Sequence, residues 1–406
     1  MLPLGCVVGG LLNHLIHVLS WQPKFLSPFK TPLVGTQRHW LDCIPVVGWI
    51  HAAFRAKNIT PYLRPLCVEL ITAALFAGFY WWEVEKQMVT GLRLEETPAN
   101  LSLFTSLSDA LGPMCWVHLA LICLMTVATW IDVDEKLIPD GITVPGTLLG
   151  LITAAWLPWS RLPGWRLPQN SQLEFLHSLS PSSWPRSLSL GSTKGMALAL
   201  GCYWLWCLGL LDRRWIGRRG IGKGITYFFA RLTRRFSTYW IAALAVLGTI
   251  ALVAARSLLD FPQEVALMSS LFGMAFGGGM IWGVRIVARW ALGREAMGFG
   301  DVTLMAMIGS FLGWQTPPMI LFFGSMLALV MAISHWLATG EQEIYFGPFL
   351  CLGALATIFF WNSVWDYCRL SFEIWWLVPA MMGFGLFLMP ALLLAIRFVK
   401  LKVAGQ

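Results

Sequence analysis

The chain has 406 residues, of which 57% are hydrophobic and 12% are charged, and its formal net charge is +8. A typical soluble domain has about 25% charged and about 45–50% apolar residues. The composition therefore excludes an ordinary soluble domain and predicts a polytopic membrane protein. Basic residues beside membrane spans usually set topology, so the positive charge indicates contact with membrane lipid, and no nucleic-acid partner is expected.

The apolar runs predict an all-α transmembrane helix bundle, because a spanning helix needs about 17–25 mostly apolar residues. The candidate segments are approximately 1–19, 66–82, 113–131, 141–159, 195–211, 238–255, 265–288, 302–314, 318–340, 347–361 and 374–396. The first lacks a basic leading region and a clear cleavage site, so we expect a retained span. Pro317-Pro318 divides the long run after residue 302 and favours a turn.

An aspartate follows two closely spaced glycines in Gly298-Phe-Gly-Asp301, and residues 302–340 after it contain no Asp, Glu, Lys or Arg. An ionisable group at the rim of such a run is costly to bury and by default marks function. Gly298 and Gly300 remove side chains beside the acid. They would let a substrate backbone approach, or let this turn adopt a positive φ.

A second acidic cluster, with Asp132, Asp134 and Asp140, also follows an uncharged stretch. Two carboxylates within hydrogen-bonding distance share a proton, so one can activate water while the other polarises a scissile carbonyl. The structural alternative is a set of solvated helix ends, with Asp301 as a helix N-cap and Asp140-Gly141 as an ordinary turn. The residues alone leave both interpretations open.

An even number of predicted membrane spans between the two acids places them on one side of the membrane. Four candidate crossings separate Asp132 from Asp301, so both are expected on the same face. That face also receives the basic segments 20–65 and 212–237 and the basic C-terminal tail, whereas loop 83–112 on the other face is net acidic. The positive-inside rule then predicts a cytoplasmic site, an external N-terminus and an internal C-terminus. Loop 160–194 fits less well, since it is basic but assigned outside.

Three motifs occur in order along the chain. They are Thr129-Trp-Ile-Asp132 through Pro145-Gly, Gly293-Arg-Glu-Ala-Met-Gly298-Phe-Gly-Asp301 through Trp314, and Phe346-Gly-Pro-Phe. Together they resemble the type IV prepilin peptidases, a family of Gly-x-Gly-Asp aspartyl membrane proteases. Gly10-Leu-Leu-Asn13, Asp42-Cys-Ile-Pro and Arg64-Pro-Leu-Cys-Val-Glu69 are similar to its N-terminal region. The resemblance covers most of residues 1–158 and 265–361.

The resemblance implies a multi-pass enzyme of the bacterial inner membrane that cleaves prepilins or pseudopilins before a hydrophobic helix. By position, the catalytic pair is Asp132 and Asp301, with Gly298 and Gly300 allowing backbone approach. Asp134, Asp140 and Glu69 are secondary candidates, although Glu69 is first expected to snorkel or pair with Arg64. The family comparison predicts about eight common helices and about three additional ones.

The chain departs from the family in its first cytoplasmic loop, where many members bind zinc through paired Cys-x-x-Cys motifs. Only Cys43 and Cys67 are present there, so no metal site is expected. Proteolysis requires no cofactor, and S-adenosylmethionine is expected only if the family's N-methylation of the new N-terminus is retained. The chain is expected to divide into an N-terminal region of residues 1–158, an insert of residues 159–264 with two extra helices, a catalytic core of residues 265–361, and a C-terminal region of residues 362–406.

Three alternatives are weighed against this interpretation. A presenilin-like protease usually has a Tyr-Asp motif, which Trp130-Ile-Asp132 lacks. An ion- or proton-coupled transporter would use the paired carboxylates as a relay, but it predicts internal repeats and acids at the membrane midplane. An inactive scaffold would tolerate loss of either acid.

Overall fold

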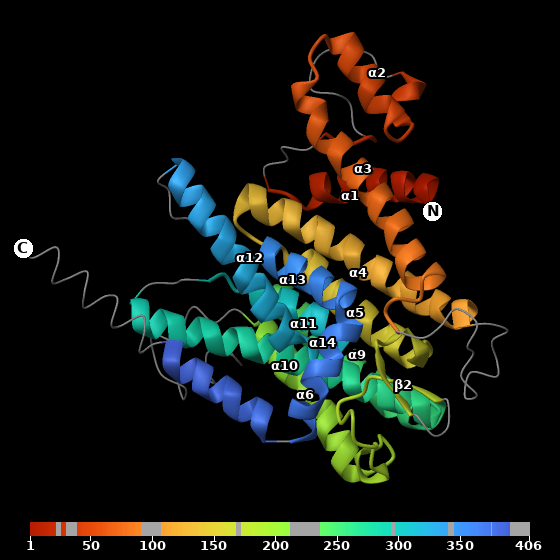
Figure 1. The fold of residues 1–406 in the computed structure, drawn as a ribbon, viewed down its shortest axis with the longest axis vertical. Helices are drawn as coiled ribbons and strands as arrows, with labels where there is room; N and C mark the ends of the chain where they lie inside the picture. The colour runs from red at the N-terminus through yellow and green to blue at the C-terminus, as the bar shows by residue number, and fades with distance from the viewer. Residues whose placement is uncertain are drawn as a thin grey trace, which may run out of the picture.

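The computed structural model describes residues 1–21, 26–29, 39–90, 107–167, 172–211, 236–293, 297–339, 345–374 and 376–389. Its helices are α1 (Leu2–Leu19), α2 (Val47–Ala56), α3 (Thr60–Tyr80), α4 (Leu107–Glu135), α5 (Asp140–Trp156), α6 (Thr193–Leu210), α9 (Phe236–Leu258), α10 (Phe261–Leu292), α11 (Gly300–Leu312), α12 (Thr316–Thr339), α13 (Gly347–Phe359) and α14 (Trp361–Glu373). A further apolar helix covers Leu377–Met389. Short helical turns lie at Trp40–Cys43, Trp81–Glu85, Pro158–Ser160 and Arg186–Leu188. The prediction of an all-α polytopic bundle is confirmed (Figure 1).

One antiparallel hairpin, β1 (Pro163–Leu167) with β2 (Gln172–Phe175), accompanies the helices. Six described helices are long and apolar enough to cross a membrane, or seven if α13 and α14, bent by 90°, form one span. The prolines 317 and 318 were expected to make the turn, but the turn lies just before them. They occupy the first turn of α12, where a missing backbone N–H costs nothing.

Helix α11 is the centre of the bundle. Every residue from Asp301 to Leu312 is buried, in agreement with a sequence that is apolar on all sides. Figure 1 shows α11 enclosed by α4, α5, α10 and α13. The helix that carries Asp301 is therefore fixed by packing on all its faces.

The glycine-rich face of α10 packs directly on α11. A Cβ at Gly277 would lie 2.6 Å from the carbonyl oxygen of Met305, and Gly273 contacts the backbone of Gly309. Small residues allow such close approach between membrane helices. Gly279, two residues further along, has open space beside it.

Residues 158–167 and 172–192 form a cap over the end of the bundle opposite Asp301. Hydrogen bonds to cap carbonyls come from Trp314 Nε1 to Ser178 at 2.7 Å, Gln315 Nε2 to His177 at 2.6 Å, Trp361 Nε1 to Pro163 at 2.8 Å, and Trp365 Nε1 to Gly164. Within the cap, the buried Arg161 donates to Leu176 O at 2.8 Å and to Ala266 O of α10 at 3.1 Å. The cap therefore connects the start of α10, the turn between α11 and α12, and the start of α14, all at the end of the bundle away from Asp301.

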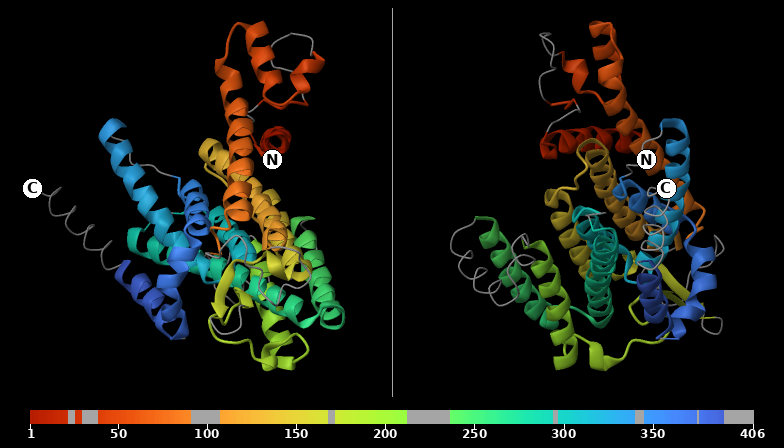
Figure 2. Two further views of the ribbon diagram at one scale, coloured as in Figure 1. Left: turned by 45° about the vertical axis from the view of Figure 1, so that its right-hand side comes forward. Right: turned by 90° about the vertical axis from the view of Figure 1, so that its left-hand side faces the viewer.

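A small lobe around α2 stands away from the bundle, as both views of Figure 2 show. Asp42 organises it by accepting hydrogen bonds from the His39 backbone N–H at 3.0 Å and from Arg55, and by pairing with His51 Nδ1 at 2.9 Å. Partial burial acts to raise the pKa of Asp42, but these hydrogen bonds and the charge of Arg55 outweigh it, so the pKa is lowered. The lobe is held by polar contacts within it.

The buried Glu69 joins this lobe to α1 and α3. It accepts hydrogen bonds from Trp49 Nε1 at 2.7 Å, the Val46 N–H at 2.5 Å and Asn13 Nδ2 at 3.2 Å. The expectation that Glu69 snorkels or pairs with Arg64 is wrong, because Glu69 is buried and Arg64 pairs with Asp134 instead.

We predict that Gly277→Ala lowers stability by about 1–3 kcal/mol, because the new methyl group overpacks the α10–α11 contact. Gly279→Ala is the matched control and should be neutral or slightly stabilising, since a helix-interior Gly costs about 0.5–1 kcal/mol relative to Ala. Thermal unfolding in detergent measures both. Equal melting temperatures for the two variants would contradict the close packing.

Candidate functional site

Asp132 and Asp301 come together at one end of the bundle. Asp132 lies in the last turn of α4, Asp301 lies in the first turn of α11, and each side chain is 7% exposed. The negative charge of Asp132 acts directly on Asp301. The two acids that the span count placed on one face therefore lie at the same end of the bundle.

The start of α13 holds Asp132. The backbone N–H of Gly347 donates a hydrogen bond to the Asp132 carboxylate. A Cβ at Gly347 would lie 2.5 Å from Asp132 Oδ2 and 2.9 Å from Ile138 Cδ1. Only glycine fits here, and the free N–H groups at a helix N-terminus favour a carboxylate. Sequence reasoning noticed Phe346-Gly-Pro-Phe but gave Gly347 no role.

The segment before α11 holds Asp301. The backbone N–H of Gly298 donates to its carboxylate, and the positive charge of Arg285 also acts on it. Arg285 Nε donates to Met297 O at 3.0 Å, and its guanidinium lies 5.6 Å from the ring centroid of Phe299. Arg285, which sequence reasoning missed, therefore fixes the turn that precedes the acid.

The two predicted glycines play different roles. A Cβ at Gly300 would lie 2.8 Å from Ile138 Cβ, whereas one at Gly298 would meet nothing closer than 3.8 Å. Among the described glycines, positive φ values occur at Gly293 and Gly313, so the turn at Gly298 and Gly300 needs none. The backbone that approaches Gly300 is the α4–α5 connection of the same chain.

The other predicted acids have different surroundings. Asp134 forms an ion pair with Arg64, with Nη1 to carboxylate oxygen distances of 2.7 and 2.9 Å. Asp140 is exposed and begins α5, so Asp140-Gly141 is the first turn of a helix and not a separate turn. Glu69 belongs to the contact between the lobe and α1. Of the five candidates, Asp132 and Asp301 are the pair in which the charge of one acts on the other.

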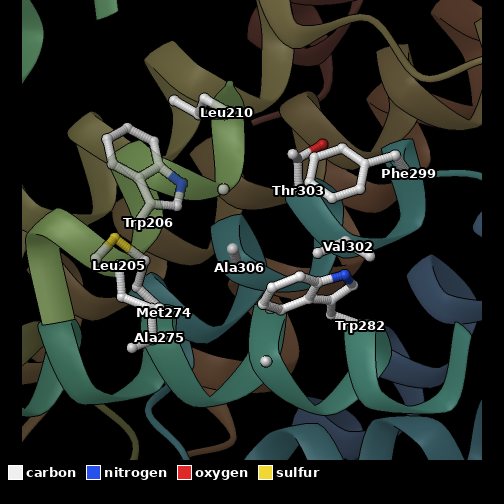
Figure 3. A pocket seen from close by; sticks show the side chains of 13 residues that line it. Leu205, Trp206, Leu210, Met274, Ala275, Trp282, Phe299, Val302, Thr303 and Ala306 are labelled. Carbon is white, nitrogen blue, oxygen red and sulfur yellow. The ribbon is translucent and has the colours of Figure 1, made fainter. Parts of the chain in front are cut away.

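A small apolar pocket lies beside the start of α11, between α6 and α10 (Figure 3). Trp206 and Trp282 stand on either side of it, and Phe299, Val302 and Thr303 reach it from the α11 side. Its floor includes Gly278 and Ala306. The pocket therefore brings a helix of the predicted insert against the segment that carries Asp301.

No group of three or more His, Cys, Asp or Glu that could hold a metal occurs in the described residues of the chain. Cys43 and Cys67 are both exposed free thiols. Asp132 and Asp301, called the dyad below, are surrounded by backbone N–H groups and the charge of Arg285.

Comparison with known proteins relates the Asp301 half of this site to a family. Residues 199–333 match the type IV leader peptidase family. The matched segment contains Gly298, Gly300, Asp301 and Arg285, and Asp132 lies before it.

Three similar relatives are each described as a prepilin leader peptidase/N-methyltransferase. The relative from Aeromonas hydrophila is 29% identical over 25% of this chain and 36% of its own length. Those from Pseudomonas aeruginosa and Escherichia coli K12 are 28% and 33% identical, over 26% and 23% of this chain and 37% and 43% of their lengths. The chain therefore aligns with less than half of each relative. No solved structure matches the chain.

We predict that Gly300→Ala impairs the site because its methyl group displaces the α4–α5 connection at Ile138. Gly298→Ala is the matched control and should keep the site intact, since its methyl group meets no close neighbour. The measurement is cleavage of a prepilin leader peptide, the activity that the relatives' descriptions name, by the two purified variants at equal folded yield. We expect at least a tenfold loss for Gly300→Ala, as a shift of about 1 Å near reacting groups costs up to about 10²-fold. Equal activities would contradict the assigned contact.

We also predict that Gly347→Ala reduces activity at least as strongly, because its Cβ would overlap the Asp132 carboxylate. The control is Gly201→Ala, on α6, where no atom lies within 4 Å of the added Cβ. A folded, fully active Gly347→Ala enzyme would show that the carboxylate does not need its present position.

Proposed function

We propose, from the match of residues 199–333 to the type IV leader peptidase family, that this chain is a membrane aspartyl endopeptidase that removes leader peptides from type IV prepilins or pseudopilins. The observation that supports the proposal most directly is the pairing of Asp132 with Asp301. The relatives' printed descriptions name prepilin leader peptidase activity, which we extend to this chain.

The chemistry follows from two carboxylates in one buried site. Their mutual repulsion favours a state in which they share one proton. The ionised member takes a proton from water, which attacks the scissile carbonyl carbon, while the protonated member donates to the carbonyl oxygen. The tetrahedral intermediate then collapses with protonation of the leaving amine, and the pair returns to its starting charge.

The backbone contacts would keep the geometry constant during this cycle. Asp132 and Asp301 each accept a hydrogen bond from a glycine N–H, so neither depends on a flexible side chain for its position. Preorganised donors of this kind need no rearrangement as charge moves. Arg285 would limit the cost of the negative charge on Asp301.

We place this site at the cytoplasmic face. The end of α1 contacts the start of α5, where a Cβ at Gly141 would lie 3.3 Å from Leu19 Cδ2, so residue 20 begins on the same side as the dyad. The basic segment that follows belongs inside by the positive-inside rule. The basic loop 212–235 and the tail after residue 389, which the same rule uses, lie outside the described residues.

The relatives' descriptions also include N-methyltransferase activity, for which S-adenosylmethionine would supply the methyl group. Glu69 is a buried acid of the N-terminal region that could face such a cofactor. Its two oxygens already accept from Asn13, Val46 and Trp49. Glu69 therefore does not fit that role.

A transporter is less well supported. Glu83 Oε1 and His118 Nδ1 form a buried pair 2.6 Å apart. His118 lies about 20 Å from Asp132 along α4. Residues 119–131 of α4 between them contain no carboxylate and no histidine. A proton relay along this helix would lack carriers.

We expect Asp132→Asn and Asp301→Asn each to lower leader removal from a co-expressed prepilin by at least about 10²-fold, the usual scale of general acid–base catalysis. Asp134→Asn and Asp140→Asn are controls and should retain cleavage. The measurement is the mobility shift of the prepilin at matched enzyme levels in the membrane. Normal cleavage by either Asp132→Asn or Asp301→Asn would sink the two-aspartate mechanism.

A further inference from the structure

A second and much larger apolar groove lies on the side of α10 away from α6. It encloses about 790 Å³ between α10, α12, α14 and the helix Leu377–Met389. Met280 of α10, Phe322 of α12, Phe372 of α14 and Met381 of the last helix are among its lining residues. Figure 1 shows α10, α12 and the dark-blue C-terminal helix on the left of the molecule, with α12 rising away from the other two.

The lining of this groove includes residues from the two segments that hold the dyad. Met297 and Phe346 line it, and they immediately precede Gly298 and Gly347. Those two glycines donate the backbone hydrogen bonds to Asp301 and Asp132. A chain leaving the dyad can therefore enter the groove directly.

The lining has the chemistry of a site for an apolar helix. None of its residues is charged, and the polar ones are Ser325, Ser371 and the thiol of Cys368. Six methionines line it, and this flexible, polarizable side chain adapts to varied apolar surfaces. A membrane helix gains little by leaving lipid for another apolar surface, so close packing in a shaped groove must supply its affinity.

We propose, resting on the proposed function, that this groove receives the hydrophobic helix that follows the cleavage site of the substrate. Leu377–Met389 forms its outer wall and thereby contributes to substrate recognition. With the helix seated here, the peptide bond before it lies between Met297 and Phe346, within reach of both carboxylates. The role of the C-terminal helix is to define which apolar segments are cleaved.

Groove-filling variants test the proposal. Gly385 lines the groove and has no atom within 4 Å of an added Cβ, so Gly385→Phe occupies the groove without a clash at the backbone. Leu388→Phe on the same helix is the control, because Leu388 is exposed and does not line the groove. On α12, Ser325→Phe fills the groove in the same way. Met326→Phe is its control, because Met326 is exposed and does not line the groove.

Each variant is assayed with a full-length prepilin and with a soluble peptide that spans the cleavage site but ends before the hydrophobic helix. We expect Gly385→Phe and Ser325→Phe to lower kcat/KM for the prepilin about tenfold or more and to leave peptide cleavage within about twofold, because only the prepilin uses remote binding energy. The two controls should cleave both substrates normally.

Photo-crosslinking gives a readout that does not depend on catalysis. A prepilin with a photoreactive residue in its hydrophobic helix is bound to the Asp301→Asn enzyme, and we expect crosslinks to α12, α14 and residues 377–389. Crosslinks to Trp206 or Trp282 instead would place the helix in the smaller pocket and overturn the proposal. Normal prepilin cleavage by both groove-filling variants, as expected if lipid fills the groove, would also overturn it. Failure of the wild-type enzyme to cleave either substrate would instead refute the proposed function.

Discussion

The insertion of Ile138 between two glycines is the contact on which the site depends. Its Cβ lies within 2.8 Å of where a Cβ on Gly300 would stand, and its Cδ1 lies within 2.9 Å of the equivalent position on Gly347. One residue of the α4–α5 connection therefore sets the spacing between the starts of α11 and α13. Asp301 belongs to the first of these helices, and the second donates the hydrogen bond to Asp132. Because Ile138 is in contact with both helix starts, a larger side chain at either glycine pushes the α4–α5 connection away from them.

Burial of α11 makes this arrangement rigid, and it also creates an electrostatic cost. A carboxylate removed from water is unstable unless charges or hydrogen bonds compensate for the lost hydration. Here the compensation comes from glycine N–H groups and from the charge of Arg285. Arg285 also binds the carbonyl of Met297, so one side chain joins charge compensation to the shape of the turn. Glu69 shows a related solution in the N-terminal region, where neutral donors from three segments surround a buried acid.

The sequence predicted the helical class, the buried acid after Gly300 and a same-face partner, because apolar length and charge asymmetry are local properties. It did not predict that Arg64 binds Asp134, that Gly347 contacts Asp132, or that Arg285 acts on Asp301. Each of these contacts joins residues more than ten positions apart, and only the packed bundle brings them together. The cap shows the same limit: its tryptophan and arginine donors bind backbone carbonyls, which every sequence contains. The turn was expected at prolines 317 and 318 but lies just before them, because proline suits the first turn of a helix as well as a turn.

The shortness of α11 has a consequence for where the site lies relative to the lipid. Thirteen residues of helix span about 20 Å, whereas the hydrocarbon core of a bilayer is about 30 Å thick. The protein around this helix must therefore carry polar groups below the headgroup level at one end or both. Irregular backbone at such depth is stable only inside protein, and the cap meets that condition at the far end through buried indole and guanidinium donors. The length of one buried helix thus sets how deep the two carboxylates lie relative to the lipid.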